Sequence, residues 1–250
     1  MAYVEFLRVR ASLAWHAGIL AVLTLIALYF GHVTDVDVDG TTHLISGTPV
    51  PIWSLATIGM FFAAIFASSQ GSSLNRENAT RDLSWTKPIP RAVLALQYIA
   101  IDIAGIAIMF ALTMLAVALV LTRLHMPPTA DASMWTLLLL GAGVPVMWYA
   151  LIQLLTFWFA PGARAVGGII WPVALLLLGL TKINGPVGAI VRAIDVINPL
   201  AYMSGVNVDA HGSHQEAVTT LPLELRPLAV WLFAAVFCAI VIALWPKKEA

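Results

Sequence analysis

Asp102 interrupts the apolar run QYIAIDIAGIAIMF, and its surroundings demand a chemical explanation. An ionised carboxylate in hydrocarbon costs about 3 kcal/mol or more, so this side chain is expected to be protonated, to pair with a cation or to face an aqueous cavity. Because Arg91 precedes it by only 11 residues, a basic partner near the membrane interface is within reach. A structural role, a role in coupling two parts of the protein and a place on a substrate path all stay open.

Two polar segments contain residue types that bind metal ions. His211 and His214 with Glu216 could ligate a divalent ion, although a polar loop with a glycine has the same composition. Residues 35–40, DVDVDG, open as a calcium loop does, but that loop closes with glutamate at its twelfth position, where this chain has Ser46. We therefore predict no metal site. A divalent metal site at His211 and His214 is the alternative.

Sequence motifs of membrane-embedded enzymes and of ATPases are missing from the chain. It has no H-E-x-x-H pair and no phosphate-binding G-x-x-x-x-G-K-[ST], and His16 is the only histidine within an apolar run. The single cysteine, Cys238, excludes an intrachain disulfide. We expect no catalytic residue and no cofactor bound by this chain, so transport that consumes ATP would need another protein.

The elements that position these residues are predicted to be membrane-spanning helices. Of the 250 residues, 60% are hydrophobic and 10% are charged, too little polar surface for a soluble globule. A hydrocarbon core about 30 Å thick takes about 20 helical residues to cross, and no apolar run alternates as a membrane strand would. We predict an all-α integral membrane protein with one domain over 1–250. Its six transmembrane helices are expected at about 12–30, 53–69, 93–121, 134–159, 165–181 and 227–245.

The basic residues are segregated to one side of this six-span arrangement. Nine of the thirteen lie on that side: Arg8, Arg10, Arg76, Arg81, Lys87, Arg91, Arg164, Lys247 and Lys248. The positive-inside rule makes it the cytoplasm, so both termini are expected to be cytoplasmic. The exceptions are Arg123 and three residues of the long connection 182–226.

The residues before the first span, 1–11, show helical periodicity of their own. Apolar residues recur on one face and polar residues on another. We predict an amphipathic helix in the cytoplasmic interface that runs into the first span. A plain charged start to the transmembrane helix is the alternative. The apolar face comprises Tyr3, Phe6, Leu7 and Leu13, and the polar face comprises Glu5, Arg8 and Ser12.

The two long outer connections have different signatures. Period-two alternation on both sides of Asp39-Gly40 predicts a β-hairpin, because that dipeptide tolerates the positive φ of a tight turn. In 182–226, the apolar stretch 185–205 is broken by prolines and polar residues. It is too interrupted for a seventh span, so we predict a re-entrant or interfacial helical segment there.

The most charged passage is Arg76 to Arg91, RENATRDLSWTKPIPR, in the cytoplasmic connection 70–92. Residues 77–86 contain no proline or glycine and predict a short helix, which Pro88 and Pro90 would end. A solvated anchor that satisfies the positive-inside rule is the simplest interpretation.

The order of residues in this passage resembles that of ABC-2 type transporter permeases. The resemblance rests on the pair Arg76-Glu77, the pair Asp82-Leu83 and the ending Thr86-Lys87-Pro88-Ile89-Pro90-Arg91. It extends to the interfacial N-terminal helix, the six spans and the broken outer segment, and so covers essentially the whole chain. Ala79 and Arg81 depart from the family pattern, which usually has a glycine and an apolar residue there.

The resemblance implies a division of labour between two kinds of subunit. In this family a separate ATPase subunit, present in two copies, binds ATP and Mg²⁺, and the short cytoplasmic helix couples to it. The residues that would make this contact are Arg76, Glu77, Asp82, Trp85, Lys87, Pro88 and Arg91. The chain is expected to act as an exporter permease in the bacterial inner membrane, in contact with lipid and with no nucleic acid partner.

The resemblance also implies a second permease copy, identical or related, around a shared pathway. Gly59, Ala63 and Ala67 recur at every fourth position of the second span and could permit close helix approach between copies. Packing of the same face within one chain is equally compatible with the spacing. The alternative function is an ATP-independent transporter or channel, which predicts internal repeats and several intramembrane charges.

Overall fold

The computed structural model describes residues 2–30, 34–36, 42–44, 50–75, 90–126, 128–130, 134–158, 163–203 and 221–245. Within these ranges the chain forms seven α-helices, three 3₁₀ helices and four short strands. The α-helices are α1 Ala2–Phe30, α2 Ile52–Gln70, α4 Arg91–Arg123, α5 Met134–Trp158, α6 Ala163–Leu180, α7 Pro186–Asp195 and α8 Arg226–Leu244. The 3₁₀ helices are η1 Ser73–Asn75, η3 Pro199–Met203 and η4 Leu223–Leu225, and the strands are β1 Thr34–Val36, β2 Thr42–Leu44, β3 Val50–Pro51 and β4 Pro128–Thr129.

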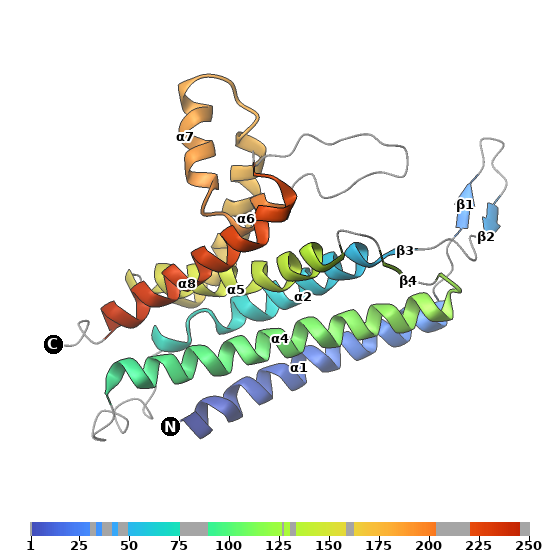
Figure 1. Cartoon of the computed structure of the whole chain (residues 1–250). Helices are drawn as coiled ribbons and strands as arrows, with labels where there is room; N and C mark the ends of the chain where they lie inside the picture. Colours follow the sequence, from blue (N-terminus) through green and yellow to red (C-terminus); the bar gives the residue numbers. More distant parts are fainter. Residues whose placement is uncertain are drawn as a thin grey trace.

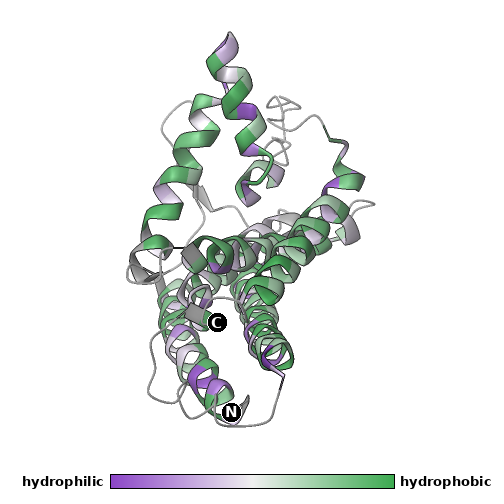
Figure 2. Ribbon diagram, turned by 90° about the vertical axis from the view of Figure 1, so that its left-hand side faces the viewer, coloured by the Kyte–Doolittle hydropathy of each residue, from purple (hydrophilic) through white to green (hydrophobic). Residues whose placement is uncertain are grey.

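Long apolar helices dominate the structure, as the composition predicts. Four are long and apolar enough to cross a membrane: Tyr3–Tyr29, Arg91–Arg123, Met134–Phe157 and Leu223–Leu244. Two shorter apolar helices, Ser54–Gln70 and Val166–Leu180, accompany them. Each of the six predicted spans therefore coincides with an apolar helix, and the chain has the character of a membrane protein. Most of each ribbon is hydrophobic in Figure 2, whereas the tip of the α6–α7 hairpin is hydrophilic.

Five of the helices, α1, α2, α4, α5 and α8, lie side by side in a bundle (Figure 1). We call the end where α1 and α4 begin and where α2 and α8 end the basal end. The distal end is the one that carries the four strands. The sixth apolar helix, α6, does not follow the bundle but leaves it together with α7 as a hairpin that projects to one side.

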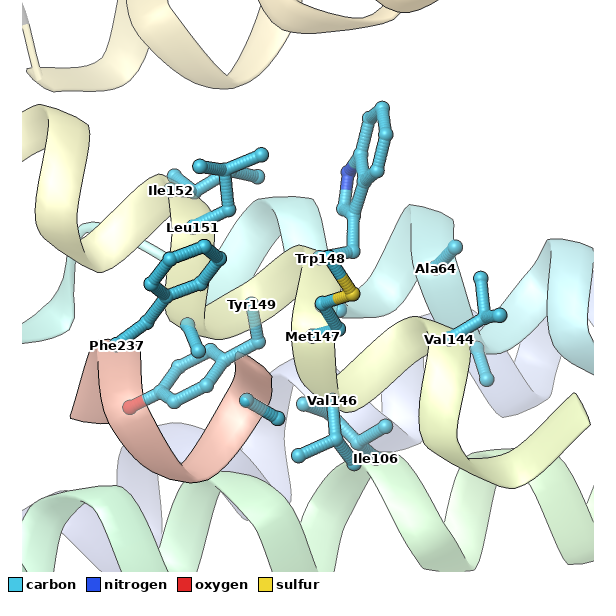
Figure 3. Packing of buried hydrophobic residues seen from close by; sticks show 14 of the residues in the cluster. Ala64, Ile106, Val144, Val146, Met147, Trp148, Tyr149, Leu151, Ile152 and Phe237 are labelled. Atoms are coloured by element: carbon cyan, nitrogen blue, oxygen red, sulfur yellow. The ribbon is translucent and has the colours of Figure 1, made fainter. Parts of the chain in front are cut away.

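The core is built around α5, since 78% of its apolar window is buried inside the structure. Met147, Trp148 and Tyr149, labelled in Figure 3, are fully buried, and Trp148 packs against Trp171 of α6 with 4.5 Å between the ring centroids. The lining helices contribute Ile106 and Phe237. By contrast, most of α1 is exposed, so in a membrane its outer face would meet lipid.

The small residues of α2 pack within the chain. Ala63 and Ala67 are fully buried. A Cβ added to Gly59 would lie 3.1 Å from the Phe110 ring of α4. Of the two interpretations of this face, close packing inside one chain is therefore the observed one, and it offers no surface to a second copy.

The amphipathic N-terminal segment is not a separate helix. It forms the first turns of α1, which continues unbroken to Phe30. The two predicted faces exist: Glu5 of the polar face is buried, whereas Tyr3 and Phe6 of the apolar face are 69% and 50% exposed. The polar face turns inward because, as described below, it meets a buried carboxylate.

The outer connections are joined by short strand pairs at the distal end. Strands β1 and β2 pair antiparallel on either side of the predicted turn, with Asp35 opposite His43, and the turn dipeptide Asp39-Gly40 itself lies outside the described residues. An unpredicted parallel pair joins β3 to β4, with Val50 opposite Pro128. This pair ties the start of α2 to the connection between α4 and α5.

The segment before the last helix is helical and broken, as predicted. Helix α7 buries Gly188, Val191 and Asp195 and exposes Val187 and Ile190. A Cβ on Gly188 would collide with the Ile183 carbonyl oxygen, so the tight turn between α6 and α7 requires glycine there. The 3₁₀ helix η3 then leads the chain back toward the bundle.

Candidate functional site

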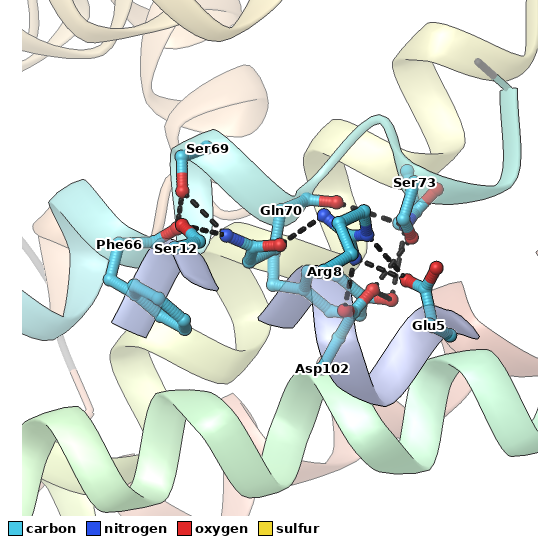
Figure 4. Close-up of polar contacts among 10 residues, drawn as sticks. Glu5, Arg8, Ser12, Phe66, Ser69, Gln70, Ser73 and Asp102 are labelled. Carbon is cyan, nitrogen blue, oxygen red and sulfur yellow. Dashed lines mark hydrogen bonds and ion pairs between the residues drawn. The ribbon is translucent and has the colours of Figure 1, made fainter. Parts of the chain in front are cut away.

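A cluster of polar side chains lies inside the basal end of the bundle, and four α-helices and the 3₁₀ helix η1 contribute to it. Its centre is the ion pair between Arg8 of α1 and Asp102 of α4, with 2.6 Å between Nη2 and Oδ1. Arg8 also donates to Glu5 through Nε at 2.8 Å and to the Gln70 side chain of α2. Figure 4 shows Arg8 between these three partners. One guanidinium thus joins α1 to both α2 and α4, since its fixed fork can bind several acceptors at once.

Asp102 is completely buried and receives three hydrogen bonds. Oδ1 accepts from Arg8, and Oδ2 accepts from Ser73 Oγ at 2.6 Å and from Tyr149 Oη at 2.8 Å. A buried charge is tolerable only when it is paired and its lone pairs are satisfied. These contacts satisfy both conditions, so the surroundings of Asp102 fit an ionised carboxylate.

Amide side chains extend the cluster along α2 and α5. Gln70 donates to Ser12 Oγ at 2.7 Å, a second link between α1 and α2. Gln153, one turn after Tyr149, donates to Ser73 Oγ at 2.6 Å and lies 3.0 Å from Tyr149 Oη. We call the set Glu5, Arg8, Gln70, Ser73, Asp102, Tyr149 and Gln153 the basal clasp.

The turn that follows α2, residues 71–75, is held by further contacts. Thr156 of α5 donates to the Gly71 carbonyl at 3.3 Å, and the indole of Trp245 after α8 donates to the Leu74 carbonyl at 3.2 Å. A Cβ on Gly71 would lie 2.5 Å from Ile152 Cγ2, so the turn sits directly on α5 because it lacks one. The last described residues before the charged connection are therefore fixed to α4, α5 and the end of α8.

A close approach between α1 and α4 brings the ion pair together. A Cβ on Gly105, one turn after Asp102, would lie 2.6 Å from Val9 Cγ1. The missing side chain lets the two helices touch beside Arg8. The glycine therefore sets the distance at which Arg8 reaches Asp102.

The side chains of the basal clasp are suited to holding helices together. Its charges are one guanidinium between two carboxylates, and its remaining members are neutral donors and acceptors. Removing one partner of such a buried pair typically costs about 3–5 kcal/mol, because the other charge is left uncompensated. Among the residues that the structure describes, no group of three or more histidine, cysteine, aspartate or glutamate side chains could hold a metal ion.

Most of the residues predicted to contact an ATPase cannot be placed relative to the basal clasp. Arg76, Glu77, Asp82, Trp85, Lys87 and Pro88 lie outside the described residues, as do His211 and His214. Arg91 is described and begins α4. Asp102, predicted to be paired, protonated or solvated, is paired.

Arg8, the partner of Asp102, and Glu5 were assigned from the sequence to the polar face of an interfacial helix. The other clasp residues, Gln70, Ser73, Tyr149 and Gln153, were not singled out. Tyr149 and Gln153 are four residues apart in an apolar span, a spacing that places both on one helix face and could have indicated a polar neighbour.

Comparisons with protein-family models, curated proteins and solved structures find no match to this chain.

Proposed function

We propose that this chain is the membrane-embedded permease subunit of an ATP-driven ABC exporter. In this proposal the connection between α2 and α4, residues 76–89, docks on a separate ATPase subunit that binds ATP and Mg²⁺. Two permease copies and two ATPase copies would complete the machine in a bacterial inner membrane. The basis for the family is the order of charged residues and prolines in this connection.

The path of the chain supports six membrane crossings. Trp231 of α8 donates to the Leu139 carbonyl near the start of α5, and Trp245 reaches Leu74 at the basal end. Helices α5 and α8 thus both run from the distal end to the basal end. The segment between them therefore has to return from the basal end to the distal end, and α6, the apolar helix of that segment, leaves the bundle together with α7.

The observation that carries the proposal is the attachment of Ser73 to Asp102. Only two residues separate Ser73 from the charged connection, and its hydroxyl is bound to the carboxylate that holds Arg8. A push on the connection would therefore reach α1, α4 and α5 through short hydrogen bonds rather than through a flexible linker. Rigid-body coupling of this kind requires such a fixed joint.

The same geometry gives the connection a defined direction. The basal end holds the start of α1 and the end of α8, so both termini would lie on the ATPase side (Figure 1). Arg91 begins α4 immediately after Pro90, which limits bending where the connection re-enters the bundle. These features favour a connection that transmits motion to the helices over one that is only a solvated anchor.

Copurification tests the proposal directly. The tagged chain, isolated from its native membranes, is expected to bring down an ATPase whose ATP hydrolysis can be measured. Lys87→Glu should reduce both the recovered ATPase and its activity, because it reverses a charge in the predicted contact. Lys182→Glu, which changes an exposed lysine at the α6–α7 turn, is the matched control and should change neither.

An ATP-independent transporter or channel is distinguished by the same preparation. The purified chain alone, reconstituted in liposomes, is expected to show no flux of its own. Flux without any ATPase, together with full recovery of partners by the Lys87→Glu variant, would refute the permease proposal.

A further inference from the structure

An apolar groove lies between α1 and α4 beyond the basal clasp. It encloses about 360 Å³ and is lined from both helices. Its depth comes from small residues, Ala17 and Ala21 on α1 and Ala116 on α4. The other lining residues are Leu20, Thr24, Leu25, Leu112, Leu115 and Leu119.

The chemistry of the groove selects a hydrocarbon occupant. Thr24 is the only lining residue with a polar side chain, and its hydroxyl donates to the Leu20 carbonyl at 2.7 Å. Water needs two to four polar partners in such a space, and no other lining side chain can hydrogen-bond. A polar ligand would lose its own hydrogen bonds without replacement.

The position of the groove makes lipid the available hydrocarbon. Residues 17–25 rise about 12 Å along α1, within a helix long enough to cross a membrane. The rims are open, with Leu25 65% exposed and Leu115 58% exposed, so a chain can enter sideways from the bilayer. An acyl chain that lies along the helices fits a hollow whose lining is almost entirely apolar.

A cation stands at the distal mouth of this groove. Leu112, Ala116, Leu119 and Arg123 recur at helical spacing, so Arg123 continues the stripe of α4 that lines the hollow. Its side chain is exposed, and within the described residues no ion pair or hydrogen bond of its guanidinium is observed. Arg123 is also one of the few basic residues that depart from the charge segregation of the chain.

A guanidinium one turn beyond an apolar groove is complementary to a phospholipid. The phosphodiester carries a negative charge at the depth where a helix leaves the hydrocarbon, and arginine binds phosphate oxygens in pairs. A basic residue is favourable at the C-terminal end of any helix, so the helix end alone accounts for an arginine at this position of α4. It does not account for the apolar groove that leads to this arginine.

We propose that one phospholipid binds here, with an acyl chain between the distal halves of α1 and α4 and its phosphate on Arg123. The site does not depend on the proposed exporter function. The ligand would occupy the exposed groove between α1 and α4, outside the buried core.

Lipid occupancy measured by native mass spectrometry tests the site. The full chain is reconstituted in phosphatidylglycerol vesicles and then transferred to mild detergent, where wild type should retain one phosphatidylglycerol per chain. Arg123→Gln should lower this occupancy about fivefold, the factor for one basic residue's attraction to an anionic lipid. Lys182→Gln is the control for loss of an exposed cation elsewhere and should leave the occupancy unchanged.

Filling the groove tests the acyl chain separately. Ala21→Phe should abolish the bound lipid, whereas Val22→Phe, at a neighbouring position that is 56% exposed and does not line the groove, should not. Size-exclusion profiles show whether both variants fold. A diacylglycerol with the same chains should bind wild type about fivefold more weakly than phosphatidylglycerol, and Arg123→Gln should remove this preference.

Two outcomes would overturn the proposal. Equal lipid retention by all four variants would mean annular lipid only. Dissociation of a dimer by Ala21→Phe, with lipid unchanged, would mean that a second copy of the chain fills the groove.

Discussion

Two buried carboxylates hold two regions of this molecule together, and they are compensated in different ways. Asp102, in the basal clasp, pairs with Arg8 and accepts from Ser73 and Tyr149. Asp195, where α7 ends, is 3% exposed and accepts from the neutral amide of Asn198 at 2.7 Å. The first acid therefore has a counter-charge and the second has an amide.

The cations near Asp195 are engaged elsewhere. Arg192 donates to the carbonyl oxygens of Thr181 and Ile183. Arg226 of α8 donates to the carbonyl of Tyr202 at 3.2 Å. Over the part of the chain that the structure covers, no ion pair joins Asp195 to a basic residue.

This difference follows from what each region connects. The basal clasp joins α1, α2, α4 and α5, and its geometry depends on a long guanidinium that spans the helices. At the α6–α7 hairpin, Asn198 binds both Asp195 and the Ala174 carbonyl at 3.0 Å, so an uncharged side chain joins the two helices. Charge removal should therefore weaken the first region and strengthen the second.

The largest effect is expected from breaking the ion pair. Arg8→Met should lower the free energy of unfolding by about 3–5 kcal/mol, because Asp102 would remain buried without its cation. The measurement is denaturant unfolding of the purified chain in detergent micelles. Arg8→Met combined with Asp102→Leu should recover part of the loss, since it removes the fully buried carboxylate and leaves only that of Glu5, whose side chain is 11% exposed, without its cation.

A double variant no more stable than Arg8→Met alone would contradict this account. It would mean that the arginine stabilises the bundle through packing of its apolar stem and not through its charge.

A smaller effect is expected when Asp102 loses one neutral donor. Tyr149→Phe removes the hydroxyl that donates to Oδ2 at 2.8 Å and keeps the buried ring. Hydrogen bonds to charged groups contribute about 1.5–3 kcal/mol, so the loss should fall in that range. Tyr3→Phe, at a position that is 69% exposed, is the control and should be nearly neutral in the same unfolding assay. Equal stability of the two variants would show that Asp102 does not need the tyrosine.

The sequence predicted the helices and the hairpin because both depend on local patterns. Apolar runs of about 20 residues have few alternatives to a helix in hydrocarbon. The dipeptide Asp39-Gly40 is a local turn signal, and strands β1 and β2 pair on either side of it. Asp102 could likewise be singled out, since a carboxylate within an apolar run is costly wherever the helix packs.

The partners of Asp102 could not be predicted in this way. Arg8 is 94 residues away in the chain. Amphipathicity separates the two faces of the first turns of α1 but does not state which face is buried. Similarly, the spacing of Gly59, Ala63 and Ala67 predicts close packing without naming the neighbour, and the divergence of α6 from the bundle has no local signal.

The smallest effect concerns Asp195 and is a dependence on pH. Burial raises the pKa of this carboxyl above its ordinary value of 3.8, and the hydrogen bond from Asn198 offsets part of that rise. The native state therefore binds more protons than the unfolded state in a window that begins near pH 3.8. Stability contributed by the protonated acid is fully present below this window and is lost as the pH rises through the native pKa.

Asp195→Asn should abolish this part of the pH dependence and make the protein more stable than wild type at pH 7. The amide keeps the size of the side chain and removes the charge that lacks a cation. Thermal unfolding of both proteins between pH 4 and pH 8 measures the difference, and Glu224→Gln, which changes an exposed acid, is the control that should follow wild type. A destabilised Asp195→Asn variant at pH 7 would mean that the carboxylate is ionised and compensated in the native state, which would remove the contrast with Asp102.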